Sequence, residues 1–126
     1  MSLPSSAQAM SFVATTSREN AKAFYGDILG LKLISEDPFA VVFETDGRKL
    51  RIPPMKDFKP QPFTVLGWSV PDIAAAVKAL KAKGVHFEIF DGLGQDELGI
   101  WNSPAGDARV AWFKDPDGNI LSLTQF

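Results

Sequence analysis

His86 and Glu88 are the residues whose types and spacing first suggest acid–base or metal chemistry. His86 is the only histidine, and an imidazole titrates near neutral pH, as a general base requires. In a strand, residues two positions apart lie on the same face, so this pair could offer two donors to a metal ion. Two donors without a third are a weak signal, and a lone histidine on an edge strand is usually a surface residue.

Arg51 carries a fixed positive charge in the strand expected over residues 49–52. A guanidinium can hold a carboxylate, a phosphate or another oxyanion of a ligand. The preceding strand, expected over residues 39–44, ends at Glu44, and Asp46-Gly47 is a strong signal for a two-residue hairpin turn between the two strands. The alternative interpretations are that Arg51 pairs with Glu44 across the sheet, or that it reaches water from an exposed face.

The end of the chain predicts a second β-hairpin, around Asp115-Pro116-Asp117-Gly118-Asn119. Proline presets φ for a turn, and glycine accepts a positive φ. With a loop of about five residues, Phe113 opposes Leu121 on a face that is expected in the core. Trp112 then opposes Ser122 on the other face, which carries a hydroxyl in the middle of a strand.

Other chemistries have little support in the sequence. It contains no cysteine, which excludes a disulfide framework, a zinc–thiolate site and a cysteine nucleophile. It has neither a glycine-rich phosphate loop nor a serine nucleophile elbow. The net charge of −2 and the lack of a basic stripe argue against nucleic acid as a partner. No apolar run has the length of a membrane span and no signal-peptide pattern occurs, so a cytoplasmic location is expected by elimination.

The elements that position these residues occur in the same order twice: a strand, a helix and three strands. In the first half, a helix is expected between Ser17 as N-cap and Gly30 at its end. Its apolar residues have the spacing of one helix face, at Ala21, Phe24, Tyr25, Ile28 and Leu29. The strands of this half are expected over residues 10–15, 31–34, 39–44 and 49–52.

The second half begins with a strand expected over residues 63–70, in which Trp68 is expected in the core. A helix follows between Asp72 and Gly84. The next strand is expected over residues 85–90. Residues 91–107 form a long glycine-rich loop around Trp101, which is either a lid over a binding site or a surface loop.

The chain is expected to form a single domain over residues 1–126 by internal duplication. Module one covers about residues 8–53, a proline-rich linker covers residues 54–62, and module two covers about residues 63–126. Met10 and Val65, which are 55 positions apart (65 minus 10), are equivalent at the start of the two modules. Arg51 and Ser122 are equivalent at their ends.

Three segments resemble the glyoxalase / bleomycin-resistance / extradiol-dioxygenase superfamily, whose members are also called vicinal oxygen chelate proteins. The segments are Ala23-Phe24-Tyr25-Gly26-Asp27-Ile28-Leu29-Gly30-Leu31, Val70-Pro71-Asp72-Ile73 and Phe113-Lys114-Asp115-Pro116-Asp117-Gly118-Asn119. Each motif is common, but all three in this order and spacing are fairly specific. The resemblance implies an α+β fold of two tandem βαβββ modules whose mixed sheets form a half-open cup.

The resemblance also implies where a divalent metal would be held, at the first and fourth strands of each module. These positions are Met10, Arg51, Val65 and Ser122 here, and none carries the usual histidine, glutamine or glutamate. Hard divalent cations need carboxylate, imidazole or carbonyl donors, and a guanidinium would repel them. We therefore expect no metal at the family's positions and no cofactor.

Alternation from these positions predicts which side chains line the cup. The lining is expected to be apolar and aromatic with a few polar groups, as is usual for a small-molecule pocket. Arg51 would anchor a charge, and Phe12 and Trp112 would contact an aromatic ligand or fill a dimer interface. The expected ligand-binding residues are Phe12, Glu44, Arg51, Trp112 and Ser122.

Two functions follow from the resemblance and these departures from it. The first is a metal-free protein that binds or sequesters a small aromatic or anionic molecule, with a homodimer as the expected assembly. Sequestration requires complementarity to the ground state only, so it does not need the lost metal donors. The alternative is a lyase, isomerase or dioxygenase with a relocated divalent-metal site, built from Glu44, His86, Glu88 or acidic residues of the loop 91–107. The sequence leaves open whether the protein is an enzyme.

Overall fold

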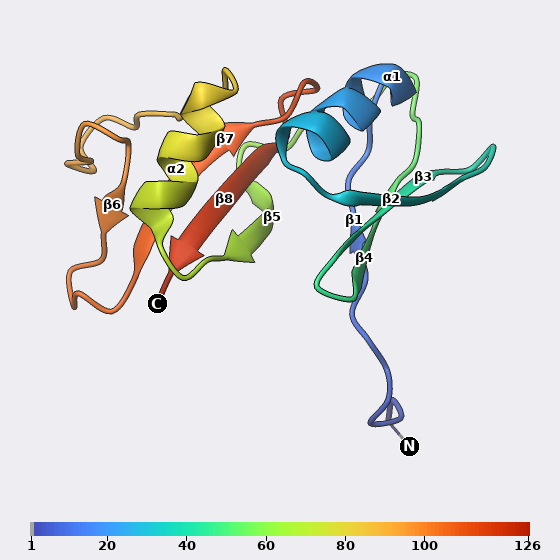
Figure 1. Cartoon of the computed structure of the whole chain (residues 1–126), viewed down its shortest axis with the longest axis horizontal. Coiled ribbons are helices and arrows are strands. Elements are labelled where there is room, and N and C mark those ends of the chain that lie inside the picture. Colours follow the sequence, from blue (N-terminus) through green and yellow to red (C-terminus); the bar gives the residue numbers. More distant parts are fainter. Residues whose placement is uncertain (1) are drawn as a thin grey trace. The chain divides into compact units, whose positions relative to one another are not determined.

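The computed structural model describes residues 2–126 and shows two compact units, Met1–Phe58 and Lys59–Phe126 (Figure 1). The boundary falls within the segment 54–62 for which a linker is predicted. Each unit contains one four-stranded mixed sheet, with the order β1-β4-β3-β2 in the first and β5-β8-β7-β6 in the second. The same order in both sheets confirms the predicted α+β class and the two tandem βαβββ modules.

The first unit has a shorter opening strand than the sequence predicts. Only Ser11–Phe12 (β1) pairs with β4, in parallel, although Thr15 forms one further bridge to Pro54. The remaining elements are α1 (Arg18–Ala21), the π-helix η1 (Lys22–Ile28), β2 (Lys32–Glu36), β3 (Val41–Thr45) and β4 (Arg48–Ile52).

The helix of the first unit begins and ends where the sequence predicts. The Ser17 hydroxyl accepts a hydrogen bond from the Asn20 backbone N–H at 3.2 Å, and Gly30 has a φ of 78°. Its second part is a π-helix, in which the Leu29 N–H donates to the Phe24 carbonyl. The apolar periodicity predicted a helix but did not distinguish the wider π turns from an α-helix.

This helix covers one face of the first sheet. The ring of Tyr25 lies 6.2 Å from that of Phe43, between the ring centroids, and both side chains are buried. Two cations of the helix also bind the sheet's edge strand: Arg18 and Lys22 lie 3.3 and 3.1 Å from the two carboxylate oxygens of Glu36. The helix is thus attached to the sheet by apolar contact and by charge.

The second unit repeats this arrangement with β5 (Thr64–Ser69), α2 (Ile73–Ala82), β6 (Trp101–Asn102), β7 (Arg109–Lys114) and β8 (Ile120–Gln125). The Asp72 side chain caps α2 by accepting from the Ala75 N–H at 3.1 Å. The helix lies across β7 and β8 (Figure 1). Ala111, Phe113, Leu121 and Leu123 of these strands are buried on the covered face.

The hairpin of β7 and β8 has the predicted register. Phe113 pairs with Leu121 and Trp112 pairs with Ser122. In the turn, the buried Asp115 carboxylate accepts from the backbone N–H groups of Asp117 and Asn119, each at 2.9 Å, and from the Asn119 side-chain amide at 2.8 Å. These contacts close the turn and satisfy the buried charge.

The prediction of a strand over residues 85–90 is wrong. Phe87 forms a single bridge with Phe113, and the Glu88 N–H donates to the Trp112 carbonyl, but no ladder continues. The Gln95 side chain is the reason, because its amide donates to the Glu88 carbonyl at 3.0 Å and accepts from the Phe90 N–H at 2.7 Å. These backbone groups are therefore diverted from the sheet.

The segment 91–107 also differs from the expected loop, because it contains the short edge strand β6. Trp101 pairs with Val110 and Asn102 pairs with Arg109. Gln95 holds this segment too, by donating to the Gly99 carbonyl at 2.8 Å. One amide side chain thus joins residues 88–90 to residues 95–99.

We expect the ion pairs of Glu36 to make stability depend on acid pH. The hydrogen bond and charge of Lys22, followed by those of Arg18, hold the pKa of Glu36 below its ordinary 4.5. A lowered folded-state pKa adds stability above pH 4.5, which is lost as the pH falls through the folded value. The free energy of unfolding from urea titrations should therefore differ between wild type and Glu36→Gln above pH 4.5 and converge at lower pH. A difference that does not change with pH contradicts this, and Glu97→Gln is the matched control.

Gln95→Ala should destabilise the second unit. It leaves the part-buried carbonyls of Glu88 and Gly99 without their hydrogen-bond donor, which typically costs ~1–3 kcal/mol. Chemical denaturation measures the loss, and hydrogen exchange should show faster exchange at the Phe90 amide. Gln61→Ala removes an exposed amide outside these contacts and should have no such effect. Equal stability of the two variants would contradict the role assigned to Gln95.

Candidate functional site

In each sheet one face is covered by the unit's own helix, and we call the opposite face the helix-free face. In the first unit, this face carries the row Phe12, Arg51 and Val42, because Arg51 pairs with Phe12 on β1 and with Val42 on β3. Glu44 lies on the same face, opposite Lys49. Three of the five predicted ligand-binding residues thus share one face of one sheet.

Arg51 does not form the ion pair with Glu44 that the sequence leaves open. None of the ion pairs among residues 2–126 includes Arg51. Its charge acts on Asp37, whose pKa is held below its usual range first by the N–H groups of Phe39 and Ala40 and then by Arg51. Arg51 is half-buried beside Phe12, whose side chain is 61% exposed. The guanidinium therefore keeps its donors for another acceptor.

The helix-free face of the second unit carries the equivalent row Gly67, Ser122 and Trp112. Ser122 is only 8% exposed, and its hydroxyl oxygen would lie 2.5 Å from a Cβ atom built on Gly67. A side chain at this position would therefore displace the Ser122 hydroxyl from its present place. The remaining two predicted residues, Trp112 and Ser122, lie side by side in this row.

Two further aromatic side chains contact Trp112. Phe90 packs edge-to-face against it at 5.5 Å between ring centroids, and Trp101 lies at 6.2 Å. Trp101 shares the helix-free face because its partner Val110 alternates with Ala111 of the core. Trp101 thus belongs to the sheet edge rather than to the tip of a free lid.

Phe90 was not among the predicted site residues. Its signal was available in the sequence, because alternation along residues 85–90 places it on the side of His86 and Glu88. Its contact with Trp112 depends on the Gln95 hydrogen bond to its N–H, which no local pattern indicates. Together, Phe90, Trp101 and Trp112 form an aromatic cluster on the second sheet.

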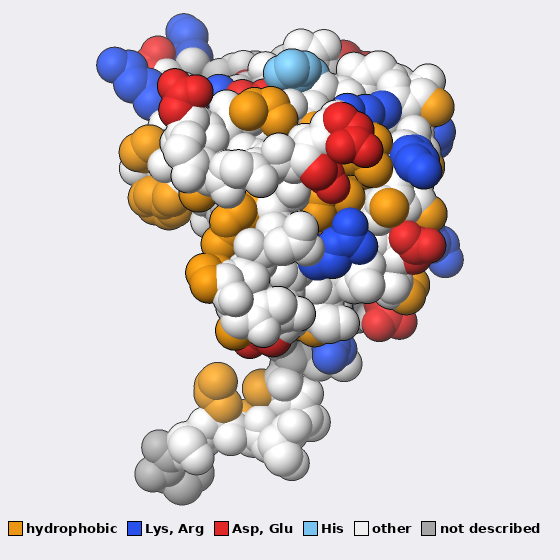
Figure 2. All heavy atoms as spheres, turned by 90° about the vertical axis from the view of Figure 1, so that its left-hand side faces the viewer, with side chains coloured by type: hydrophobic (Ala, Val, Ile, Leu, Met, Phe, Trp, Pro, Cys, Tyr) orange, Lys and Arg blue, Asp and Glu red, His pale blue; other side chains and the backbone are white. Residues whose placement is uncertain are grey.

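His86 and Glu88 approach each other but do not gather a third donor. His86 Nε2 lies 3.8 Å from one Glu88 oxygen, and Lys114 Nζ lies 3.7 Å from the other. The His86 side chain is 83% exposed, and Figure 2 shows the histidine at the surface. Across residues 2–126, no group of three or more His, Asp or Glu side chains could hold a metal ion.

The family's metal positions do not fit a metal in this chain. They carry Met10, Val65, the buried hydroxyl of Ser122 and the guanidinium of Arg51. Two of the four side chains have no donor atom for a hard cation, and Arg51 is itself a cation.

Each unit has a surface hollow away from these residues. One of about 490 Å³ lies in the second unit beside the end of α2, and one of about 290 Å³ lies in the first unit between η1 and β2. Neither hollow includes any of the five predicted residues. The face in Figure 2 mixes acidic and basic side chains, without a broad patch of one sign.

No helix in the described residues 2–126 has both the length and the hydropathy needed to cross a membrane. Among solved structures, the chain is similar to a glyoxalase family protein from Bacillus anthracis (19% identity, TM-score 0.73, 98% of each chain covered). It is also similar to lactoylglutathione lyase from Agrobacterium tumefaciens (17%, 0.74, covering 97% of this chain and 95% of the other). A third similar structure is the fosfomycin resistance protein FosX from Listeria monocytogenes (14%, 0.74, covering 96% and 93%).

The structural similarity to these proteins, at such low identity, shows the fold alone, and no curated protein matches the sequence. The family itself is shown by the sequence, which matches a family model over residues 8–123. That span includes both modules and all five predicted site residues. The chain belongs to the Glyoxalase/Bleomycin resistance protein/Dioxygenase superfamily.

Proposed function

We propose that this protein binds and sequesters a small aromatic or anionic molecule on the helix-free faces of its sheets. The observation that carries the proposal is Arg51, a half-buried guanidinium that forms no ion pair with any of residues 2–126. A guanidinium that is partly removed from water, and that forms no direct ion pair within residues 2–126, is well suited to a carboxylate or phosphate of a ligand.

The aromatic cluster of the second unit supports the other half of the proposal. Trp112 is half-buried on the helix-free face, with Phe90 and Trp101 packed against it. Such a cluster presents a large, rigid apolar surface, and flat rings pack well against it. Phe12 supplies a further exposed ring next to Arg51.

Binding without chemical transformation agrees with the side chains at the family's metal positions. Sequestration depends on affinity for the ground state, so it does not require a Lewis acid. Among the similar structures, one is described as a fosfomycin resistance protein and another as a lactoylglutathione lyase. The side chains that this chain carries at the family's metal positions favour binding without transformation.

The proposal predicts that Arg51 and Trp112 determine affinity for an aromatic anion. With 8-anilinonaphthalene-1-sulfonate as the probe, Arg51→Met and Trp112→Ala should each weaken binding by about tenfold. The first variant loses a charge-assisted contact with the sulfonate, and the second loses a ring contact. Fluorescence titration measures this. Arg48→Met and Trp68→Phe are matched controls that leave the helix-free faces intact.

The double variant shows whether both side chains contact one bound molecule. Coupled effects of the two substitutions indicate that both side chains contact one bound molecule. Additive effects on two separate binding events indicate that each side chain contacts a different bound molecule. Unchanged affinity in both single variants would contradict the proposal. So would one equivalent of divalent metal retained after incubation and dialysis, because it would redirect attention to the alternative of a relocated metal site in an enzyme.

A further inference from the structure

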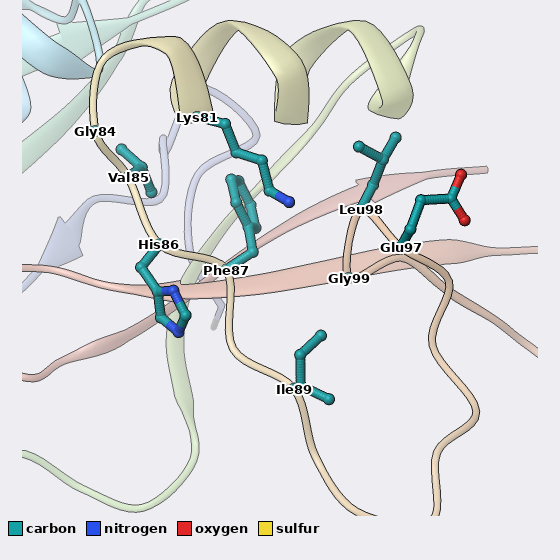
Figure 3. Close-up of a pocket in the computed structure, with 9 residues that line it drawn as sticks. All are labelled: Lys81, Gly84, Val85, His86, Phe87, Ile89, Glu97, Leu98 and Gly99. Carbon is teal, nitrogen blue, oxygen red and sulfur yellow. The ribbon is translucent and has the colours of Figure 1, made fainter.

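Figure 3 shows the residues that line the hollow of the second unit, whose volume is about 490 Å³. The hollow lies on the side of the sheet opposite to the aromatic cluster. Its floor includes Phe87, whose ring lies 5.3 Å from that of Phe113 on the helix-covered face. Trp112 directly precedes Phe113 in β7 and therefore lies on the other face. A ligand in this hollow would therefore not occupy the surface proposed above.

The walls of the hollow are held in place by hydrogen bonds and close packing. Gln95 donates to the carbonyls of Glu88, which lies between the lining residues Phe87 and Ile89, and of Gly99, which lines the facing wall. Gly99 has a φ of 85°, and a Cβ atom on it would lie 3.3 Å from the Cβ of Phe87. Because the walls are joined in this way, the hollow exists before any ligand binds.

The lining combines apolar side chains with one well-placed cation. In Figure 3, Lys81 extends from α2 toward the space between Phe87 and Leu98. The Lys81 ammonium forms no ion pair with any of residues 2–126. Ile89 also lines the hollow and is 63% exposed, so it contributes apolar surface that a ligand could cover.

The other charged groups at the hollow limit what it can accept. The Glu97 carboxylate lies beyond Leu98 as seen from Lys81, and the His86 ring points away from Lys81 (Figure 3). A second negative charge on a ligand would face Glu97. The charges therefore fit a molecule with a single anionic group at the Lys81 end.

We propose that this hollow is a second binding site, for a small monoanion with an apolar chain, such as a medium-chain carboxylate. Its carboxylate binds the Lys81 ammonium, and its chain covers Phe87, Ile89 and Leu98. The volume of about 490 Å³ is within the range of small-molecule sites, and the lining mixes apolar side chains with the charged Lys81 and Glu97, as an amphipathic ligand requires. The hollow is open on one side, so binding is expected to be rapid and reversible.

Octanoate is the probe for this site, followed by two-dimensional ¹H–¹⁵N NMR. Octanoate should shift the amide signals of residues 84–89 and 97–99. Lys81→Glu should weaken its affinity by about tenfold, while Lys78→Glu, the same charge change on the same helix, should not. Ile89→Ser should also weaken binding, whereas Ile34→Ser, an exposed isoleucine of the first unit, should not.

Three outcomes would overturn the second site: no shifts at all, shifts confined to the helix-free faces, or shifts at the hollow that Lys81→Glu leaves unchanged. Glu97→Gln should bind octanoate at least as tightly as wild type, and weaker binding would contradict the assigned polarity. Arg51→Met should leave the octanoate shifts at the hollow unaffected. A failure of this proposal is therefore distinguishable from a failure of the proposed function.

Discussion

The pairing of β7 with β8 is the constraint on which the second unit depends. It places Phe113 and Leu121 under α2 and leaves Trp112 and Ser122 on the helix-free face. A shift of one residue would bury the tryptophan–serine pair and expose the core, so the apolar face selects one register. The turn contributes as well, because the buried Asp115 carboxylate binds three N–H groups and holds the loop in one conformation.

The duplication leaves equivalent rows in the two sheets, but their side chains are distributed differently. In the first row the aromatic residue is Phe12 on the short first strand, and a cation stands at the centre. In the second row the first strand contributes Gly67, a hydroxyl stands at the centre, and the aromatic residue is Trp112. The two helix-free faces thus differ chemically while their backbones remain alike. This difference supports one face suited to charge and another suited to flat apolar groups.

The largest departure from the repeat lies between α2 and β7. The edge strand β2 of the first sheet has only a two-residue counterpart, β6, in the second sheet, and the Gln95 side chain supplies hydrogen bonds that a longer strand would otherwise make. This exchange has consequences on both sides of the sheet. On one side it brings Phe90 against Trp112, and on the other it joins the walls of the hollow beside Lys81.

The elements that depend on local chemistry could be predicted from the sequence. The caps at Ser17 and Asp72 and the register across the Asp115 turn follow from side chains that bond within a few residues, and the order of the elements follows from apolar periodicity. The predicted residues Arg51 and Trp112 were assigned to faces by the same alternation, and the structure places them there. What those residues contact could not be predicted, because it depends on segments that are distant in the sequence. Arg51 does not form an ion pair with Glu44. Residues 85–90 do not form a strand, because the side chain of Gln95 in the following loop forms hydrogen bonds with their backbone groups. Such contacts join segments whose local sequences carry no sign of each other, so they follow from how the chain packs rather than from any local pattern.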